Sequence, residues 1–167
     1  MLLHWLIALA ILGQIAFGWY LESVPRLTPE RAIFVNLHKS TGLAIGILIL
    51  FRIAWRLSHK PPPFPAAMPA WEQSAARVNH ALLYVCMLVM PIAGYTASNF
   101  SKFGVKLFNA VLLPPWGVDD REIYAAFNAL HVTTSFVFVA LIAIHVTAAL
   151  RHVFFARYGI FRRMLPS

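Results

Sequence analysis

Long apolar stretches alternate with short polar connections along the whole chain. A helix needs about 20 residues, each rising about 1.5 Å, to cross the hydrocarbon core of a bilayer. Four stretches approach or exceed this length, at residues 2–20, 33–55, 81–97 and 125–150. The pattern predicts an all-α membrane protein with four transmembrane helices, formed by one domain over residues 1–167.

Proline and charge mark the connections between these stretches. Residues 21–31 are rich in both, residues 56–77 contain Pro61, Pro62, Pro63 and Pro65, and residues 98–124 contain an adjacent proline pair. Because proline removes a helical hydrogen-bond donor, we expect the helices to end there. The first stretch lacks the basic region and the small-residue cleavage pattern of a signal peptide before Glu22, so we interpret it as the first membrane helix.

Composition supports the membrane interpretation. Apolar residues make up 60% of the 167-residue chain and charged residues 12%, against about 45–50% apolar residues in a typical soluble domain. Mean hydropathy is +0.69, which excludes an ordinary soluble enzyme and a disordered chain. The single cysteine, Cys86, lies within an apolar run, so neither a disulfide framework nor a thiolate metal cage is expected.

The net charge of +8 would suggest nucleic-acid binding in a soluble protein, but here the basic residues lie at the ends of apolar runs. We therefore expect a membrane lipid surface as the partner and no nucleic acid. One predicted face carries eight Lys and Arg and the other six, so the positive-inside rule predicts that both termini are cytoplasmic. The four spans are expected to alternate in direction and form a four-helix bundle. The eight are Arg52, Arg56, Lys60, Arg77, Arg151, Arg157, Arg162 and Arg163, and the six are Arg26, Arg31, Lys39, Lys102, Lys106 and Arg121.

Five of the seven histidines fall within or at the ends of the predicted spans. They are His4, His38, His80, His131 and His145. Ionisable residues at membrane depth are costly and usually functional. One such histidine is readily explained by a hydrogen bond between helices, but five together indicate a function.

Histidine spacing predicts two levels within the membrane. His131 and His145 are 14 residues apart on one predicted helix, so they share a face and lie about 21 Å apart along the axis. His38 begins the second span on the side of His131, and His4 begins the first on the side of His145. Each level therefore has two histidines available from two different helices.

Two imidazoles that face each other across a bundle suit the axial positions of a haem iron. Zinc fits less well, because it requires three or four ligands at one level and the outer level offers only His38 and His131. Gly42, one turn from His38, and Gly18, 14 residues after His4, would admit a flat macrocycle, although small residues are also common at helix contacts. Arg52 reaches the inner level and would pair with haem propionates, or extend to the membrane surface.

These positions together resemble the bacterial cytochrome b561 family over nearly the whole chain. They are His4 with Trp5, His38 with Gly42 and Arg52, His80 with Tyr84, the Pro-Ile-Ala-Gly segment at 91–94, and His131, His145 and His152. The 14-residue histidine spacing is also similar to that of the cytochrome b subunits of hydrogenases and formate dehydrogenases.

The resemblance implies two haem b groups, with His4 and His145 ligating the inner iron and His38 and His131 the outer iron. It also implies a multi-pass protein of the bacterial inner membrane that exchanges electrons with ubiquinone and, as in some members, oxidises superoxide. Two other functions remain open at this point. One is an anchor subunit that conducts electrons for a docked dehydrogenase or hydrogenase, and the other is a structural membrane protein without haem.

Two remaining histidines and three lysines complete the expected sites. We expect His80 and His152, both near the inner level, to line a ubiquinone site, because histidine carries protons near neutral pH. His80 could instead replace an inner haem ligand, and His152 could be a simple interfacial residue. Lys39, Lys102 and Lys106 would attract superoxide or another periplasmic donor to the outer haem, although acidic residues share their loop. The acidic residues of this loop are Asp119, Asp120 and Glu122.

Overall fold

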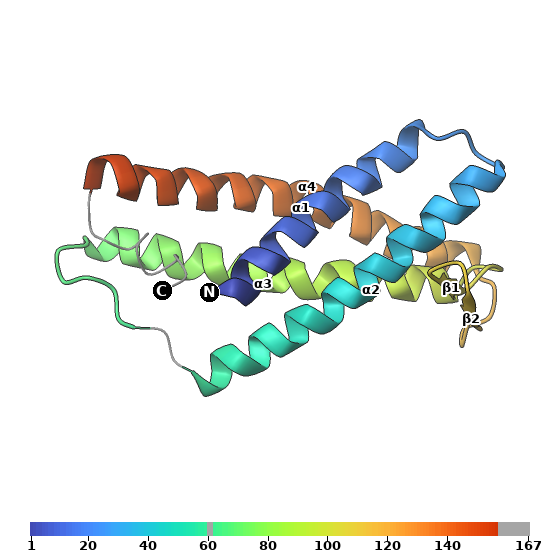
Figure 1. Ribbon diagram of the computed structural model, residues 1–167, viewed down its shortest axis with the longest axis horizontal. Helices are drawn as coiled ribbons and strands as arrows, with labels where there is room; N and C mark the ends of the chain where they lie inside the picture. The colour runs from blue at the N-terminus through green and yellow to red at the C-terminus, as the bar shows by residue number, and fades with distance from the viewer. Residues whose placement is uncertain (60–61, 157–167) are drawn as a thin grey trace.

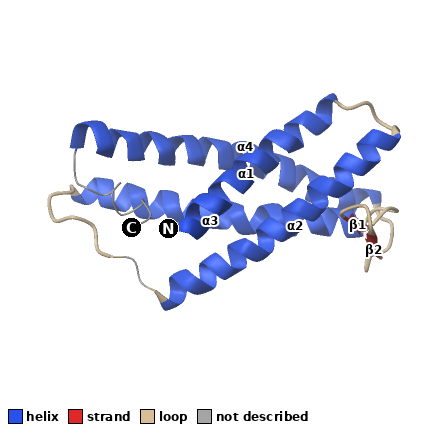
Figure 2. Ribbon diagram, viewed as in Figure 1, coloured by secondary structure: helices blue, strands red, loops and turns tan. Residues whose placement is uncertain are grey.

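The computed structural model describes residues 1–59 and 62–156, which form four long helices (Figure 2). Each is long and apolar enough to cross a membrane, which confirms the predicted all-α membrane architecture. A short turn of π-helix, η1 (His152–Ala156), follows the last helix. The helices are α1 (Leu2–Ser23), α2 (Pro29–Ser58), α3 (Ala70–Asn99) and α4 (Arg121–Arg151).

The helices form two antiparallel pairs. α3 and α4 pack side by side, while α1 and α2 cross them obliquely and also contact each other (Figure 1). The start of α1 and the end of α4 lie toward the same end of the molecule, which we call the inner end. The opposite, outer end carries the α1–α2 connection and the strands described below. Of the basic residues used to predict the orientation, Lys60, Arg157, Arg162 and Arg163 lie outside the described residues.

The helices extend beyond the predicted apolar stretches. α3 begins at Ala70, so the prediction that residues 56–77 are all connection was wrong at its C-terminal end. Hydropathy alone misses this segment because polar residues dominate its first turns. At the start of α4, the Asp120 side chain accepts hydrogen bonds from the backbone N–H groups of Glu122 and Ile123, which explains why the helix begins before residue 125.

A small antiparallel hairpin at the outer end was not predicted from the sequence. Strands β1 (Val105–Leu107) and β2 (Val111–Leu113) pair within the connection between α3 and α4. Ser40 anchors the hairpin to α2, because its buried Oγ accepts a hydrogen bond from Phe108 N at 2.8 Å. The Asn36 side chain accepts a second one from Lys106 N at 3.2 Å. The hairpin is thereby fixed against the outer part of α2.

A compact apolar cluster lies between the two predicted histidine levels. All four helices contribute to it, and Phe138 of α4 is 4% exposed. The buried members are Ile7, Ile11, Ile49, Cys86, Met87 and Phe138. Many other large apolar side chains point outward, as expected for a surface that faces lipid.

Candidate functional site

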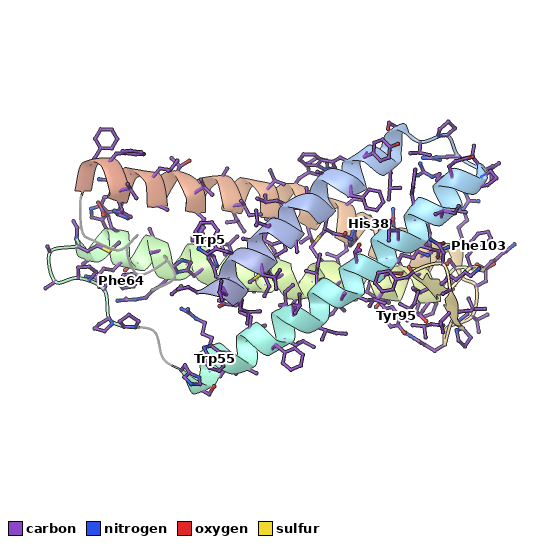
Figure 3. All side chains as sticks on the ribbon, viewed as in Figure 1. Trp5, His38, Trp55, Phe64, Tyr95 and Phe103 are labelled. Atoms are coloured by element: carbon purple, nitrogen blue, oxygen red, sulfur yellow. The ribbon has the colours of Figure 1, made fainter. Side chains whose placement is uncertain are left out.

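The outer histidine pair joins α2 to α4. His38 is labelled on α2 in Figure 3. Its ring centre is 6.2 Å from that of His131, and the two ring planes make an angle of 83°. His131 Nδ1 is 2.9 Å from the backbone carbonyl oxygen of Met90. Since a carbonyl only accepts, Nδ1 carries the hydrogen, and Nε2 retains a lone pair for a metal. His38 Nδ1 is buried and has no hydrogen-bond partner among the described residues.

The inner pair joins α1 to α4. The ring centres of His4 and His145 are 6.4 Å apart and the ring planes make an angle of 72°. Arg52 of α2 lies beside this pair, with Nη2 at 3.1 Å from His4 Nδ1. A guanidinium only donates, so His4 Nδ1 accepts in this arrangement. An iron at His4 Nε2 would require Arg52 to release the ring and would leave the guanidinium available to a carboxylate.

Both pairs match the spacing of two ligands on one metal ion. With metal–nitrogen bonds of about 2 Å on opposite sides of the ion, two imidazoles place their ring centres about 6 Å apart. The measured values of 6.2 and 6.4 Å agree with this separation. The predicted pairing by level is therefore compatible with the geometry, and the residues present fit two bis-histidine haem sites.

Two glycines allow the outer histidines to approach neighbouring helices. A Cβ built on Gly94 of α3 would lie 3.0 Å from His131 Nδ1, and one on Gly18 of α1 would lie 3.1 Å from His38 Cε1. Gly94 is one turn after Met90, so its missing side chain leaves room for His131 to reach the Met90 carbonyl. The predicted Gly42 instead faces Gln14, because its Cβ would lie 3.1 Å from Gln14 Nε2.

A third imidazole lies at the inner level. The ring centre of His80 is 5.3 Å from that of His145, with an interplanar angle of 63°. This distance is shorter than in the two pairs, so His80 fits a position beside His145 better than one across a metal from it. His152, the other histidine predicted at a quinone site, lies at the end of α4 with Nδ1 at 3.9 Å from Glu72 Oε2.

Sequence reasoning missed two polar residues at these levels. Gln14 Nε2 donates to the His38 carbonyl at 2.6 Å, and its Oε1 accepts from Thr41 at 2.7 Å, which ties α1 to α2 beside the outer pair. Its signal was a lone amide within an apolar span. Glu72 was not predicted because residues 56–77 were interpreted as connection. The available signal was its charge, which is opposite to that of Arg151, with which it pairs at 2.8 Å.

The three lysines lie at the outer end in different environments. Lys39 is partly buried, and its Nζ donates to the Gly104 carbonyl at 2.9 Å. Lys102 is exposed and lies 3.9 Å from Asp119. Lys106 is exposed on β1. Lys39 thus helps to hold the loop before the hairpin, whereas Lys102 and Lys106 contribute charge to the surface.

Comparison with known proteins decides the family. The family model described as prokaryotic cytochrome b561 matches residues 1–167. The chain belongs to the prokaryotic cytochrome b561 family. Cytochrome b561 homolog 2 of Escherichia coli K12 is 28% identical over 163 residues, covering 97% of this chain and 86% of that protein.

Two further relatives of this cytochrome span almost its whole length. Cytochrome b561 homolog 1 of Escherichia coli K12 is 26% identical, with 98% of this chain and 93% of that protein covered. A protein of Yersinia pestis named probable superoxide oxidase CybB is 23% identical, with 99% and 92% covered. The family confirms the resemblance seen in the sequence and implies haem b as the cofactor of a membrane electron carrier.

Replacing any one of the four paired histidines is expected to remove one of two components of the haem spectrum and leave the other. His38→Ala and His131→Ala should remove one component of the reduced spectrum, and His4→Ala and His145→Ala the other, because each haem iron would lose one of the two histidines expected to hold it. Haem content per chain and reduced-minus-oxidised spectra measure this. His59→Ala is the control, since this ring stacks on Trp55 at 3.9 Å outside both pairs. Loss of the same component in His4→Ala and His38→Ala would contradict pairing by level.

Gly94→Ala is expected to weaken haem retention at the outer level. Its methyl group would meet His131 at 3.0 Å, and overpacking of this kind costs about 1–3 kcal/mol, equivalent to a loss of affinity of about 5-fold to 150-fold. Haem titration of the apoprotein, followed by the outer spectral component, measures the change. Gly13→Ala is the matched control, because its Cβ would meet nothing within 4 Å. Equal affinities in both variants would show that Gly94 is not needed for close approach.

Proposed function

We propose that this cytochrome is a dihaem b oxidoreductase that takes electrons at its outer end and passes them to ubiquinone at its inner end, with superoxide as the outer donor. The observation that carries the proposal is the presence of two histidine pairs along α4, each at the separation expected for one metal ion. The haem groups would supply iron that carries one electron at a time. The protein fixes their positions and surroundings.

Four histidines would hold the haems at fixed levels. His38 and His131 would ligate the outer iron, and His4 and His145 the inner iron. Because His131 and His145 are separated by 14 residues of one continuous helix, the two levels cannot slide relative to each other. The buried Phe138 lies midway between them, within an apolar cluster that excludes water from the path between the levels.

In the proposed orientation the protein lies in a bacterial inner membrane and its inner end faces the cytoplasm. By sequence, eight of the 14 Lys and Arg residues fall on the inner side and six on the outer side, and the positive-inside rule favours cytoplasmic placement of the side with more of them. The hairpin end would then face the periplasm. This orientation carries electrons inward, from a periplasmic donor to the quinone pool.

Superoxide is the donor that the outer surface supports best. Lys102 and Lys106 are exposed there, and a positive surface raises the encounter rate of a small anion. A relative is also named a probable superoxide oxidase. Oxidation of superoxide to oxygen releases one electron, which suits a one-electron carrier. Lys39 would act mainly by holding the loop at Gly104 near His38.

At the inner end, His80 and His152 would line the ubiquinone site. His80 lies against the inner ligand His145, and His152 begins η1, directly after the end of α4. Reduction of ubiquinone requires two protons as well as two electrons. His152 would donate protons to the quinone oxygens, while His80 would contact the ring next to the inner haem.

A docked redox partner is the second candidate for the outer donor. Large apolar side chains are exposed at this end, and Phe103 and Val118 are 82% and 83% exposed. Such side chains favour protein contacts. In this alternative the chain conducts electrons between a soluble dehydrogenase or hydrogenase and the quinone pool.

His152→Gln is expected to slow oxidation of the reduced haems by ubiquinone by about 10-fold or more, because a general acid is lost. Both haems should be retained, since the four histidines proposed as ligands are unchanged. Stopped-flow spectroscopy of the haem absorbance measures the rate. His59→Gln serves as the control. Unchanged oxidation in His152→Gln would remove His152 from the quinone site.

Reduction by superoxide is expected to depend on salt and on outer charge. Exposed charges are screened over about 8 Å at physiological ionic strength, so added salt should slow reduction by superoxide but not by a neutral reductant. Lys106→Glu should slow it a further few-fold, whereas Arg77→Glu, at the inner end, should leave it unchanged. Rates insensitive to both salt and Lys106→Glu would exclude electrostatic steering, and absence of any reduction by superoxide would favour the docked partner.

A further inference from the structure

Glu72 is a buried carboxylate in the first turn of α3. Its side chain is 5% exposed, although it lies at the inner end of a helix where water is near. Oε1 accepts a hydrogen bond from Arg151 Nη1 at 2.8 Å. Oε2 accepts none from the described residues, and it faces His152 Nδ1 at 3.9 Å. The two oxygens therefore face two consecutive residues, the last of α4 and the first of η1.

The partners of the two Glu72 oxygens decide whether burial of this carboxylate destabilises the folded protein. Burial of a carboxylate is unfavourable unless both oxygens are satisfied. The Arg151 side chain is 51% exposed and satisfies only one of them. Arg77, the next cation along α3, donates to Gln73 at 3.2 Å. The second oxygen of Glu72 is thus directed to the imidazole of His152.

We propose that Glu72 is a positioning residue for quinone reduction, which holds His152 through Nδ1 and restores the proton that His152 gives to ubiquinone. The proposal rests on the proposed function. A carboxylate at Nδ1 orients an imidazole and leaves Nε2 directed to the substrate. The half-exposed Arg151 places the Glu72 carboxylate next to inner-side water, from which protons are drawn.

The overall reaction balances with the donors already named. Ubiquinone takes up two electrons and two protons to form ubiquinol. Two superoxide ions each lose one electron and become two oxygen molecules, and the electrons pass inward one at a time. For each electron, His152 Nε2 gives one proton to a quinone oxygen, and the Glu72 side returns one proton from water to the imidazole.

Glu72→Gln tests this role with little change in shape. The amide oxygen of Gln can still accept from Arg151, so the tie between α3 and α4 is kept while the charge beside His152 is lost. We expect unchanged haem content, unchanged reduction by superoxide, and a limiting rate of haem oxidation by ubiquinone lowered about 10-fold. The ubiquinone concentration for half-maximal rate should stay the same, because Glu72 does not touch the quinone.

Glu22→Gln is the matched control. Glu22 also pairs with an arginine, Arg31, at 3.9 Å, but it is exposed and lies at the outer end of α1. Its limiting rate should equal that of the unaltered cytochrome. A limiting rate in Glu72→Gln equal to that of Glu22→Gln would overturn the role of Glu72 and leave the quinone function intact. Failure of ubiquinone to oxidise the unaltered cytochrome would instead overturn the proposed function.

A double-mutant cycle separates action through His152 from a general effect on the inner end. If Glu72 acts through His152, Glu72→Gln should lower the rate less than 2-fold further in a His152→Gln background. If the double variant lowers the rate by the product of the two single effects, the proposal is overturned. Should Glu72→Gln fail to retain haem, Glu72→Asp provides the test, since its shorter side chain withdraws the carboxylate from His152. A full limiting rate in that variant would also overturn the proposal.

Discussion

The pairing of imidazoles across the bundle, with α4 supplying one member of each pair, is the constraint on which the rest of the structure depends. The rings of His131 and His145 must point the same way on one helix, so α2 and α1 must each bring one histidine to the correct level. The oblique crossing of α1 and α2 over α3 and α4 satisfies this requirement (Figure 1). The apolar cluster around Phe138 fills the space that remains between the levels.

The four helices could be predicted because a bilayer imposes a simple rule on the sequence. Each span must satisfy its backbone groups internally and present apolar side chains outward, which yields long apolar runs. The true start of α3 was missed because that rule applies only within the hydrocarbon core. Beyond it, Ala70 to Arg77 form a helix through packing and hydrogen bonds that hydropathy does not record. The hairpin was missed because its stability depends on Ser40 and Asn36, about 70 residues away in the sequence.

The histidine levels could be anticipated from helical periodicity alone, because His131 and His145 lie on one helix. Contacts between helices could not be predicted from periodicity. Gly94 belongs to the Pro-Ile-Ala-Gly segment at 91–94, but its closeness to His131 depends on how α3 lies against α4. The lysines looked equivalent in the sequence, yet Lys39 is held by a backbone carbonyl and Lys106 is exposed. Glu72 likewise acquires its surroundings only when the beginning of α3 meets the end of α4.

The two levels differ in what orients their histidines, and this determines which substitutions each level can tolerate. His131 is held by the main-chain oxygen of Met90, which remains whatever side chain stands at that position. His4 is contacted by the side chain of Arg52, which a single codon change can remove. A substitution at position 90 would keep the carbonyl partner of His131, whereas a substitution of Arg52 would remove the partner of His4. The orientation of His4 is therefore the one that a change of a partner's side chain can alter directly.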